Sequence, residues 1–481
     1  MSEAVTTTGP PVSRARAGRD IVGQVVLRTT NLALGIAVTV LVVRTLGDEG
    51  FGQWSTLLAI LNFAGYFSVL GLQQVAVERA AADAERAPEW LGALVTLRLA
   101  LTGPATLLAL AVCLWVSEDE TMRVAALLVC ATLPVAAAGA LRAVFQLRVR
   151  NTVATAIELG QGILWLVAVA LVAVLDGGVV AIAAAMLAVT AAANLATVAI
   201  ALRTAPVRLR GARSHWPVLV RLGLPVGIGG LLTLGYGYVD QVIVFQVAGA
   251  REAGLYGAVY RIYERAQFLP STLMITLFPI FVVARDTDLE RVRRLFRTTI
   301  DYLVLVSLPA LAIALAGPEQ IVRLLFGAEF ADAAPALPVL MAALVVVSVG
   351  HLTGYLIVAY RLQRRFVVLG VAALAVNVAA NLALVPSYGF MAAAWVTLGT
   401  EVLVMSVSLA MVCRRAGVPP RGAHLGRIVL AAAGTGAVAW GLRRAGLPVL
   451  AWVGIAGAAY AALLLALGAV RVAELRALVR R

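Results

Sequence analysis

Long apolar blocks separated by short polar stretches run through almost the whole chain. The first covers about residues 21–43, and most blocks reach the roughly 20 residues that an α-helix needs to cross the hydrocarbon core of a bilayer. The others lie at about 53–75, 91–116, 122–145, 153–175, 179–202, 219–247, 254–283, 299–316, 335–360, 367–386, 389–413, 428–442 and 449–470. The pattern predicts an all-α polytopic membrane protein with about 14 transmembrane helices.

Two of the polar turns between blocks resemble each other. LGDEGFGQWS (46–55) aligns without a gap with AGAREAGLYG (248–257), so that Gly47 pairs with Gly249 and Gly52 with Gly254. Repeated halves are a common plan of secondary transporters. We therefore expect two pseudo-symmetric six-helix lobes and two further C-terminal helices. The predicted domains are a disordered cytoplasmic tail (1–20), an N-lobe (21–202), a cytoplasmic linker (203–218), a C-lobe (219–413), and helices 13 and 14 with a cytoplasmic tail (414–481).

The distribution of arginine predicts the orientation of these helices. All 39 basic residues are arginine, and with the N-terminus inside, 27 of them fall in inner loops and tails against 6 in outer ones. This asymmetry follows the positive-inside rule. We therefore expect a multi-pass protein of the cell membrane with both termini in the cytoplasm. It also explains the net charge of +14 by topology, so nucleic acid is not an expected partner.

Several kinds of chemistry are disfavoured by composition. The chain has no lysine, which excludes a phosphate-binding loop of the Walker type. Its three cysteines and three histidines are scattered without metal-ligand spacing. We expect no cofactor and no metal.

Charged and polar residues inside the apolar blocks are candidates for function, because such groups are costly in a bilayer and normally face a cavity or a partner. Arg28 and Asn31 share a face of the first block, and Arg261 and Arg265 share a face of the eighth. Tyr260 lies beside them and adds an aromatic ring to the candidate substrate-binding residues.

Four stretches carry a resemblance to a known family. LVVRTLGDEGFGQWSTL, YVDQVIVFQVAGAREAGLYGAVYRI, VRLLFGAEFADAAPALPVL (322–340) and NVAANLALVPSYGFMAAAWVTLGTEVL (377–403) occur in this order. Together they resemble the polysaccharide, or O-antigen, flippases of the multidrug/oligosaccharidyl-lipid/polysaccharide exporter superfamily. The resemblance covers roughly residues 20–415, and the last two apolar blocks lie outside it.

The resemblance implies a transporter rather than an enzyme. It implies that the chain moves a polyprenyl-diphosphate-linked oligosaccharide to the outer leaflet by alternating access, for cell-surface polysaccharide biosynthesis. Arg28 and Arg261 stand where family members are thought to hold the lipid diphosphate. Membrane lipids, and the polymerase or glycosyltransferases of the same pathway, are the implied partners.

Three acidic residues in the spans are candidates for coupling transport to H⁺ or Na⁺. They are Asp240, Glu158 and Glu401. Asp240 has a second interpretation, which we favour: an ion pair with Arg261. Glu264 is an alternative partner for Arg261 or Arg265.

Two other functions compete with a flippase. A drug/cation antiporter of the same superfamily should have an acidic cavity, whereas arginines outnumber acids in these spans. An integral-membrane glycosyltransferase or polymerase would use an acidic pair such as Asp48–Glu49, or a large outer loop. The loop at 46–55 is short, and its repeat at 248–257 favours a structural turn.

Overall fold

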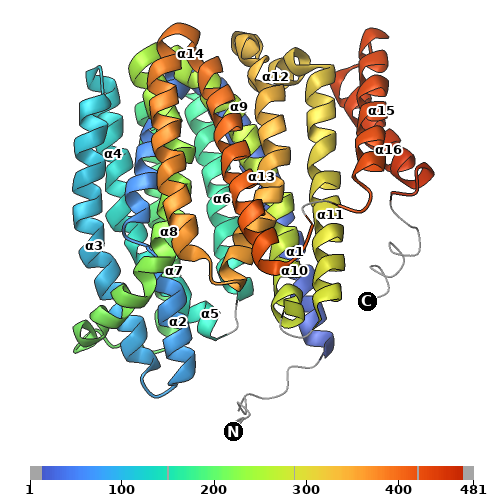
Figure 1. Ribbon diagram of the computed structural model, residues 1–481. Coiled ribbons are helices and arrows are strands. Elements are labelled where there is room, and N and C mark those ends of the chain that lie inside the picture. Colours follow the sequence, from blue (N-terminus) through green and yellow to red (C-terminus); the bar gives the residue numbers. More distant parts are fainter. Residues whose placement is uncertain (1–13, 149–150, 286–287, 420–421, 470–481) are drawn as a thin grey trace.

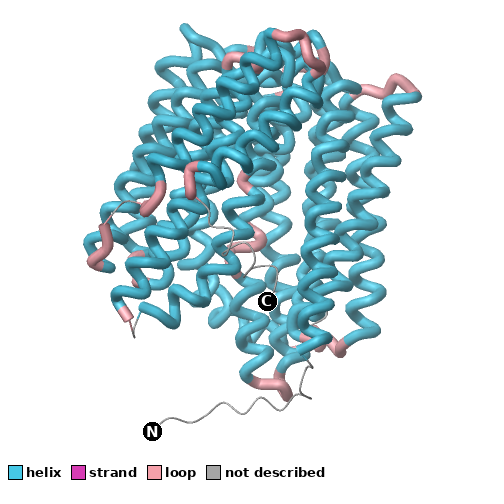
Figure 2. Tube along the Cα trace, turned by 90° about the vertical axis from the view of Figure 1, so that its right-hand side faces the viewer, coloured by secondary structure: helices cyan, strands magenta, loops and turns pink. Residues whose placement is uncertain are grey.

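The computed structural model describes residues 14–148, 151–285, 288–419 and 422–469. Within these ranges the chain is helical apart from short turns and loops, and Figure 2 shows the helices running side by side with the loops gathered at both ends. The predicted tail at 1–20 falls mostly outside the described residues.

The N-lobe and the C-lobe follow one another along the chain (Figure 1). The N-lobe contains α1 (Arg14–Tyr66), α2 (Leu72–Ala82), α3 (Ala87–Val116), α4 (Glu120–Ala137), α5 (Arg142–Leu147), α6 (Asn151–Val174) and α7 (Val179–Thr204). The C-lobe contains α8 (Trp216–Ala248), α9 (Ala250–Ala266), α10 (Phe268–Arg285), α11 (Leu289–Ala316), α12 (Pro318–Phe326), α13 (Ala336–Ala359) and α14 (Gln363–Ala416). The C-terminal pair is α15 (Leu425–Arg444) and α16 (Val449–Ala466).

The number of spans agrees with the apolar pattern. Among the described residues, 12 helical segments are long and apolar enough to cross a membrane, and α9 with α10 form one of them. Two of the twelve, in α1 and in α14, contain a non-helical residue, Gly47 and Gly389 respectively. Figure 1 shows α14 as a hairpin that turns over at the top. Counting the two arms of each broken helix separately gives about the 14 spans that the sequence predicts.

One backbone conformation recurs at four turns on the same end of the molecule. The four residues have φ between 57° and 106° with ψ near 180°, a region that essentially only glycine occupies. They are Gly47, Gly249, Gly327 and Gly389. We call this end the turn end. The opposite end, with the linker 203–216 and both ends of α14, is the arginine-rich end.

The two lobes meet backbone to backbone at the turn end. A Cβ on Gly52 would lie 1.8 Å from the carbonyl oxygen of Ala250, and one on Gly254 would lie 1.8 Å from that of Asp48. Gly52 and Gly254 are 202 residues apart, and so are Asp48 and Ala250. This is the offset of the sequence repeat. The contact is therefore reciprocal, as a two-fold relation between the lobes requires.

The apolar cores are distributed unevenly between the two ends. One large core at the turn end takes residues from both lobes, for example Phe51 and Trp54 with Tyr256. The arginine-rich end has two smaller cores, one in the C-lobe with the C-terminal pair and one in the N-lobe that also takes Leu219 and Trp216 from the start of α8. Close contact there is kept by α8, since a Cβ on Gly227 would lie 2.6 Å from the Cα of Leu70.

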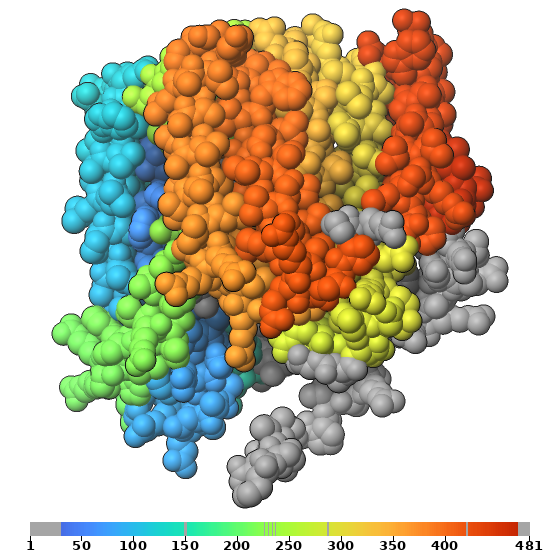
Figure 3. All heavy atoms as spheres, viewed as in Figure 1, coloured from blue at the N-terminus to red at the C-terminus, as the bar shows by residue number. Residues whose placement is uncertain are grey.

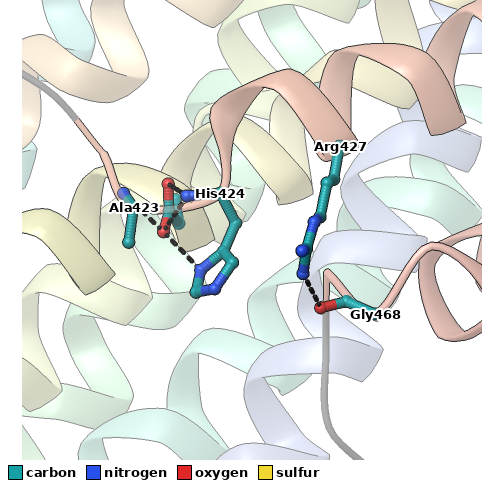
Figure 4. Close-up of polar contacts among 5 residues, drawn as sticks. Ala423, His424, Arg427 and Gly468 are labelled. Atoms are coloured by element: carbon teal, nitrogen blue, oxygen red, sulfur yellow. Dashed lines mark hydrogen bonds and ion pairs between the residues drawn. The ribbon is translucent and has the colours of Figure 1, made fainter.

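The C-terminal pair α15 and α16 packs on the outside of the C-lobe, against α11 (Figures 1 and 3). At the arginine-rich end the buried carboxylate of Asp301 accepts hydrogen bonds from the backbone N–H groups of Ala423 and His424, at 3.0 and 3.0 Å. Figure 4 shows these two residues and their contacts just before α15 begins. At the opposite end of α11, the buried side chain of Trp452, which is 1% exposed, packs against Ala316. These contacts fix the pair to one lobe only.

Candidate functional site

A cavity of about 540 Å³ lies between the lobes in the middle of the helix bundle. Side chains of α1, α6 and α7 line it from the N-lobe, and Arg261 and Arg265 of α9 line it from the C-lobe. We call it the arginine cavity. Of the predicted substrate residues, Asn31, Arg261 and Arg265 line this cavity together, and Glu158 lies at its wall. The side chain of Arg28 lies outside the described residues.

Arg265 has an exposed guanidinium with no acidic partner. It reaches toward α1, where a Cβ on Gly35 would lie 3.2 Å from its Nη1 atom. In the part of the chain that the structure describes, it forms no ion pair and no hydrogen bond, and the absence of a side chain at Gly35 leaves it room. An unpaired cation inside a transmembrane helix is costly unless an anion arrives to meet it.

Arg261 is paired, but with Glu264 and not with Asp240. Its Nη1 atom lies 2.6 Å from Oε2 of Glu264, and the other oxygen of Glu264 accepts a hydrogen bond of 2.9 Å from the hydroxyl of Tyr238. The favoured prediction of an Asp240–Arg261 pair was therefore wrong. Arg261 stands five residues beyond Tyr256 on α9, which turns it about 140° away from the face that meets Asp240.

Asp240 is fully enclosed by neutral hydrogen-bond donors. Its carboxylate accepts from the Asn381 amide at 2.8 Å, from the Thr397 hydroxyl at 2.8 Å and from the Tyr256 hydroxyl at 3.2 Å. Asp240 is 1% exposed, and within the described residues no arginine pairs with it. The Oδ1 atom of Asn381 is buried there without a hydrogen-bond partner. Four helices, α8, α9 and both arms of α14, thus meet around one carboxylate.

A second cavity of about 710 Å³ lies within the C-lobe, on the other side of α9. We call it the C-lobe cavity. Tyr260 lines this cavity and not the arginine cavity, and its ring packs between those of Tyr256 and Tyr263 with centroids 5.4 and 5.3 Å away. Glu264 and Glu401 supply acidic groups, so the two cavities differ in charge. The Arg261–Glu264 pair forms the boundary between them, because each partner lines one cavity.

The other two acidic candidates do not take part in the hydrogen bonds around Asp240. Glu401 is 6% exposed, and one of its oxygens accepts a hydrogen bond of 3.2 Å from the hydroxyl of Tyr263. Glu158 forms an ion pair of 3.2 Å with Arg142 of the same lobe. The structure therefore brings Glu158 to the arginine cavity and Glu401 to the C-lobe cavity.

Sequence reasoning passed over several lining residues. Trp54 and Trp165 face each other across the arginine cavity wall with ring centroids 6.4 Å apart, and His351 lines the C-lobe cavity with a buried Nε2 atom that lacks a partner within the described residues. A histidine or tryptophan deep in an apolar block was the available signal. No group of three or more metal-ligating side chains occurs in the described ranges.

The turn end is closed over the arginine cavity by polar contacts between elements. Arg251 bridges Asp48 at 3.0 Å and Asp332 at 2.7 Å. Below it, the buried amide of Gln241 donates to the Ser55 hydroxyl at 2.9 Å and thereby joins α8 to α1. Asp48 thus has a structural role in this turn, as the repeat indicated, and is not a free acidic group.

Comparisons with known proteins agree with this architecture. The family model described as Polysaccharide biosynthesis protein matches residues 41–335. No curated protein matches the chain by sequence. Among solved structures, the lipid II flippase MurJ in an inward closed conformation has a TM-score of 0.72 at 11% identity, covering 92% of this chain and 98% of that one. An inward-facing multidrug resistance MATE family transporter of the MOP superfamily has a TM-score of 0.63 at 16% identity, with 81% and 94% covered. Likeness at these identities establishes the fold.

Proposed function

Because the chain belongs to the polysaccharide biosynthesis protein family, we propose that it is a flippase for polyprenyl-diphosphate-linked oligosaccharide. It carries this lipid from the inner to the outer leaflet by alternating access between the two lobes, for the assembly of cell-surface polysaccharide. Glycosyltransferases that build the lipid-linked sugar and a polymerase that consumes it are the partners of such a step.

The observation that carries the proposal is the unpaired Arg265 in the arginine cavity. A diphosphate brings a negative charge for Arg265, because Glu158, the acidic residue that lines this cavity, is already paired with Arg142. Guanidinium groups bind phosphate oxygens with two parallel hydrogen bonds and stay charged at every physiological pH. Arg261 borders the same cavity and, with its charge shared with Glu264, assists Arg265 in holding the diphosphate. Arg28 remains a proposed contact from the N-lobe, and Asn31 a hydrogen-bond partner for the same group.

The sugars fit the C-lobe cavity better than the arginine cavity. Tyrosine rings stack on the apolar faces of sugar rings, and carboxylates accept hydrogen bonds from sugar hydroxyls. Tyr260 offers a ring at this cavity, and Glu401 and His351 offer polar atoms. The lipid-linked head group would therefore reach across α9, with its diphosphate on one side and sugar on the other.

Asp240 is the ion-coupling residue that the geometry favours among the three candidates. A carboxylate surrounded by neutral groups can take up a cation or a proton without displacing an arginine. The hydroxyl of Thr397 and the partnerless Oδ1 atom of Asn381 supply further oxygens of the kind that bind Na⁺. We propose that H⁺ or Na⁺ binding at this site biases the arrangement of the four helices around it.

Orientation completes the proposal. The positive-inside rule places the arginine-rich end in the cytoplasm and the turn end outside. Because the turn end is closed, we propose that this conformation precedes opening to the outside in the transport cycle. Reporter fusions at residues 120, 177, 250 and 387 should read outside, and fusions at 148, 210, 290 and 420 should read inside. A reversed reading at any of them would contradict this topology.

A drug/cation antiporter is a second candidate, and the C-lobe cavity is the observation that favours it. Glu264 and Glu401 with neighbouring tyrosines could bind an organic cation through charge and cation–π contacts. The paired state of Glu264 weakens this attraction, because Arg261 already neutralises it.

The experiment that separates these functions uses the purified chain in liposomes. A fluorescent polyprenyl-diphosphate-linked N-acetylglucosamine is placed in one leaflet, and its appearance in the other is followed by dithionite quenching. The wild type should accelerate this movement, and Arg265→Gln should slow it about tenfold or more, as expected for loss of a charged hydrogen bond. Arg123→Gln, which removes an exposed arginine at the turn end, serves as control. Uptake of ethidium without lipid movement would favour the antiporter.

A further inference from the structure

Three arginines converge on a groove between the two arms of α14 at the arginine-rich end. The groove has a volume of about 480 Å³ and is lined by Arg365 at the start of α14 and by Arg414 and Arg415 at its end. Its remaining lining residues are Ser406, Val407, Ala410 and Met411. We call it the α14 groove.

The α14 groove shares no lining residue with either of the two cavities described above. The second arm of α14 lines the C-lobe cavity with Glu401, Val404, Met405 and Ser408. The groove residues Val407, Met411 and Arg414 are three or four residues apart, so they share one side of the second arm, and they continue beyond the C-lobe cavity to the end of α14. Figure 3 shows both arms of α14 at the surface of the molecule, where no other described segment covers them. A ligand can therefore reach the groove directly from the bilayer or its surface.

The positive charge of the groove is not compensated by the chain. Arg365, Arg414 and Arg415 are exposed, and within the described residues they form no ion pair and no hydrogen bond. Some other arginines at this end are paired, as Arg142 is with Glu158 and Arg293 with Glu290. No acidic residue lines the groove. Topology alone requires arginines at this end, but it does not require three of them around one hollow.

The surroundings of the groove suit the acyl chains of a lipid. Val368 and Val371 on the first arm are 68% and 54% exposed, and Leu403 and Val407 on the second arm are each 37% exposed. They continue from the arginines toward the middle of the span, where acyl chains lie. The hydroxyl-bearing Ser406 stands beside the arginines and adds a hydrogen-bond donor.

We propose that the α14 groove binds the phosphate head group of an anionic phospholipid of the inner leaflet. Basic pockets between transmembrane helices on the cytoplasmic side are a known mode of phospholipid recognition. Two or more guanidinium groups can share the phosphate oxygens, while the acyl chains lie along the exposed valines. Since α14 also carries Asn381, Thr397 and Glu401, a lipid bound between its arms would hold together the helices that surround Asp240.

The test measures lipid binding and not transport, so its outcome is independent of the proposed flippase function. The chain is placed in nanodiscs of phosphatidylcholine with or without phosphatidylglycerol, and bound lipids are counted by native mass spectrometry. A triple variant carries Arg365→Gln, Arg414→Gln and Arg415→Gln. Its affinity for phosphatidylglycerol should fall at least about tenfold, because charge-assisted phosphate contacts are lost. Size-exclusion chromatography checks that the variant is folded, and the corresponding lysine variant should retain part of the affinity.

The matched control removes the same charge from the same end but outside the groove. Its substitutions are Arg294→Gln, Arg361→Gln and Arg364→Gln, all at exposed positions. It should change the affinity by less than about twofold. Equal loss in both triple variants would reduce the effect to general surface charge and overturn the proposal. Displacement of phosphatidylglycerol by millimolar inorganic phosphate, or much tighter binding of polyprenyl diphosphate in the groove, would also overturn it.

Discussion

Gly52 and Gly254 lie backbone against backbone where α1 and α9 cross, and each occupies the same place relative to the other helix. A Cβ on either would come within 1.8 Å of a carbonyl oxygen opposite. The crossing therefore lies on the two-fold axis that relates the lobes, and it seals the turn end above the arginine cavity.

Gly52→Ala and Gly254→Ala should destabilise the closed turn end to a similar extent. Each methyl group meets backbone, which cannot rotate away, so the helices must separate at an expected cost of about 1–3 kcal/mol. Thermal unfolding in detergent measures this cost. Gly399→Ala on α14, where a Cβ would meet open space, is the control and should not destabilise. Full stability of both crossing variants would show that the lobes are not held together here.

Glu264→Gln should lower the amount of folded protein, because it leaves the guanidinium of Arg261 without its partner. Breaking one side of a largely buried ion pair typically costs about 3–5 kcal/mol. The double variant Arg261→Gln with Glu264→Gln should recover much of that loss. Protein level and thermal stability are measured for the two singles and the double. If the double loses as much as the two singles together, the pair is not coupled.

Arg265→Gln should behave in the opposite way to Glu264→Gln. Its guanidinium has no described acidic partner, so folding should be unaffected while movement of the diphosphate lipid falls. Normal transport at normal protein level would remove Arg265 from the site. A loss of folded protein would instead assign it a structural role.

Asp240→Asn should uncouple transport from the ion gradient and keep the fold. The side chain has the same shape, but three donors, from Asn381, Thr397 and Tyr256, then meet a neutral amide in place of a carboxylate. Lipid movement is measured in liposomes with an imposed H⁺ or Na⁺ gradient. Glu401→Gln in the same lobe is the comparison, and it should leave the dependence on the gradient intact. The reverse result would transfer the coupling role to Glu401.

The turn end should become more stable as the pH falls. Burial, and then the nearby carboxylate of Asp48, raise the pKa of Glu329 above its ordinary value. A carboxyl with a raised pKa holds its proton more firmly in the folded state, so stability increases as the pH falls through that pKa. Glu329→Gln should flatten this dependence and add less than about 1 kcal/mol at neutral pH, since Glu329 is largely exposed. Glu118→Gln at the same end is the control, and an equal effect there would exclude a specific role for Glu329.

The sequence predicted the fold well because its main signals are local. Apolar blocks locate the helices, and the aligned Gly47 and Gly249 indicated the repeat that appears as the reciprocal contact. The pairing of side chains was harder to predict, because it depends on how each helix is rotated about its axis. Asp240 faces the two arms of α14, which follow more than 100 residues later, and Arg261 faces away from it. Arg265 and Asn31 could be placed in one cavity by their helical faces, whereas the assignment of Tyr260 to a second cavity needed the structure.

The uneven distribution of the apolar cores has a kinetic consequence. Any motion that opens the turn end must divide the one core that both lobes share, and apolar side chains such as Phe51 and Tyr256 must lose their packing before new contacts form. Opening at the arginine-rich end divides much less, because the core there takes only Leu219 and the partly buried Trp216 from α8. The highest activation barrier of the cycle should therefore be the separation of the lobes at the turn end. Substitutions in that shared core should then change how fast the protein turns over and leave its affinity for substrate almost constant.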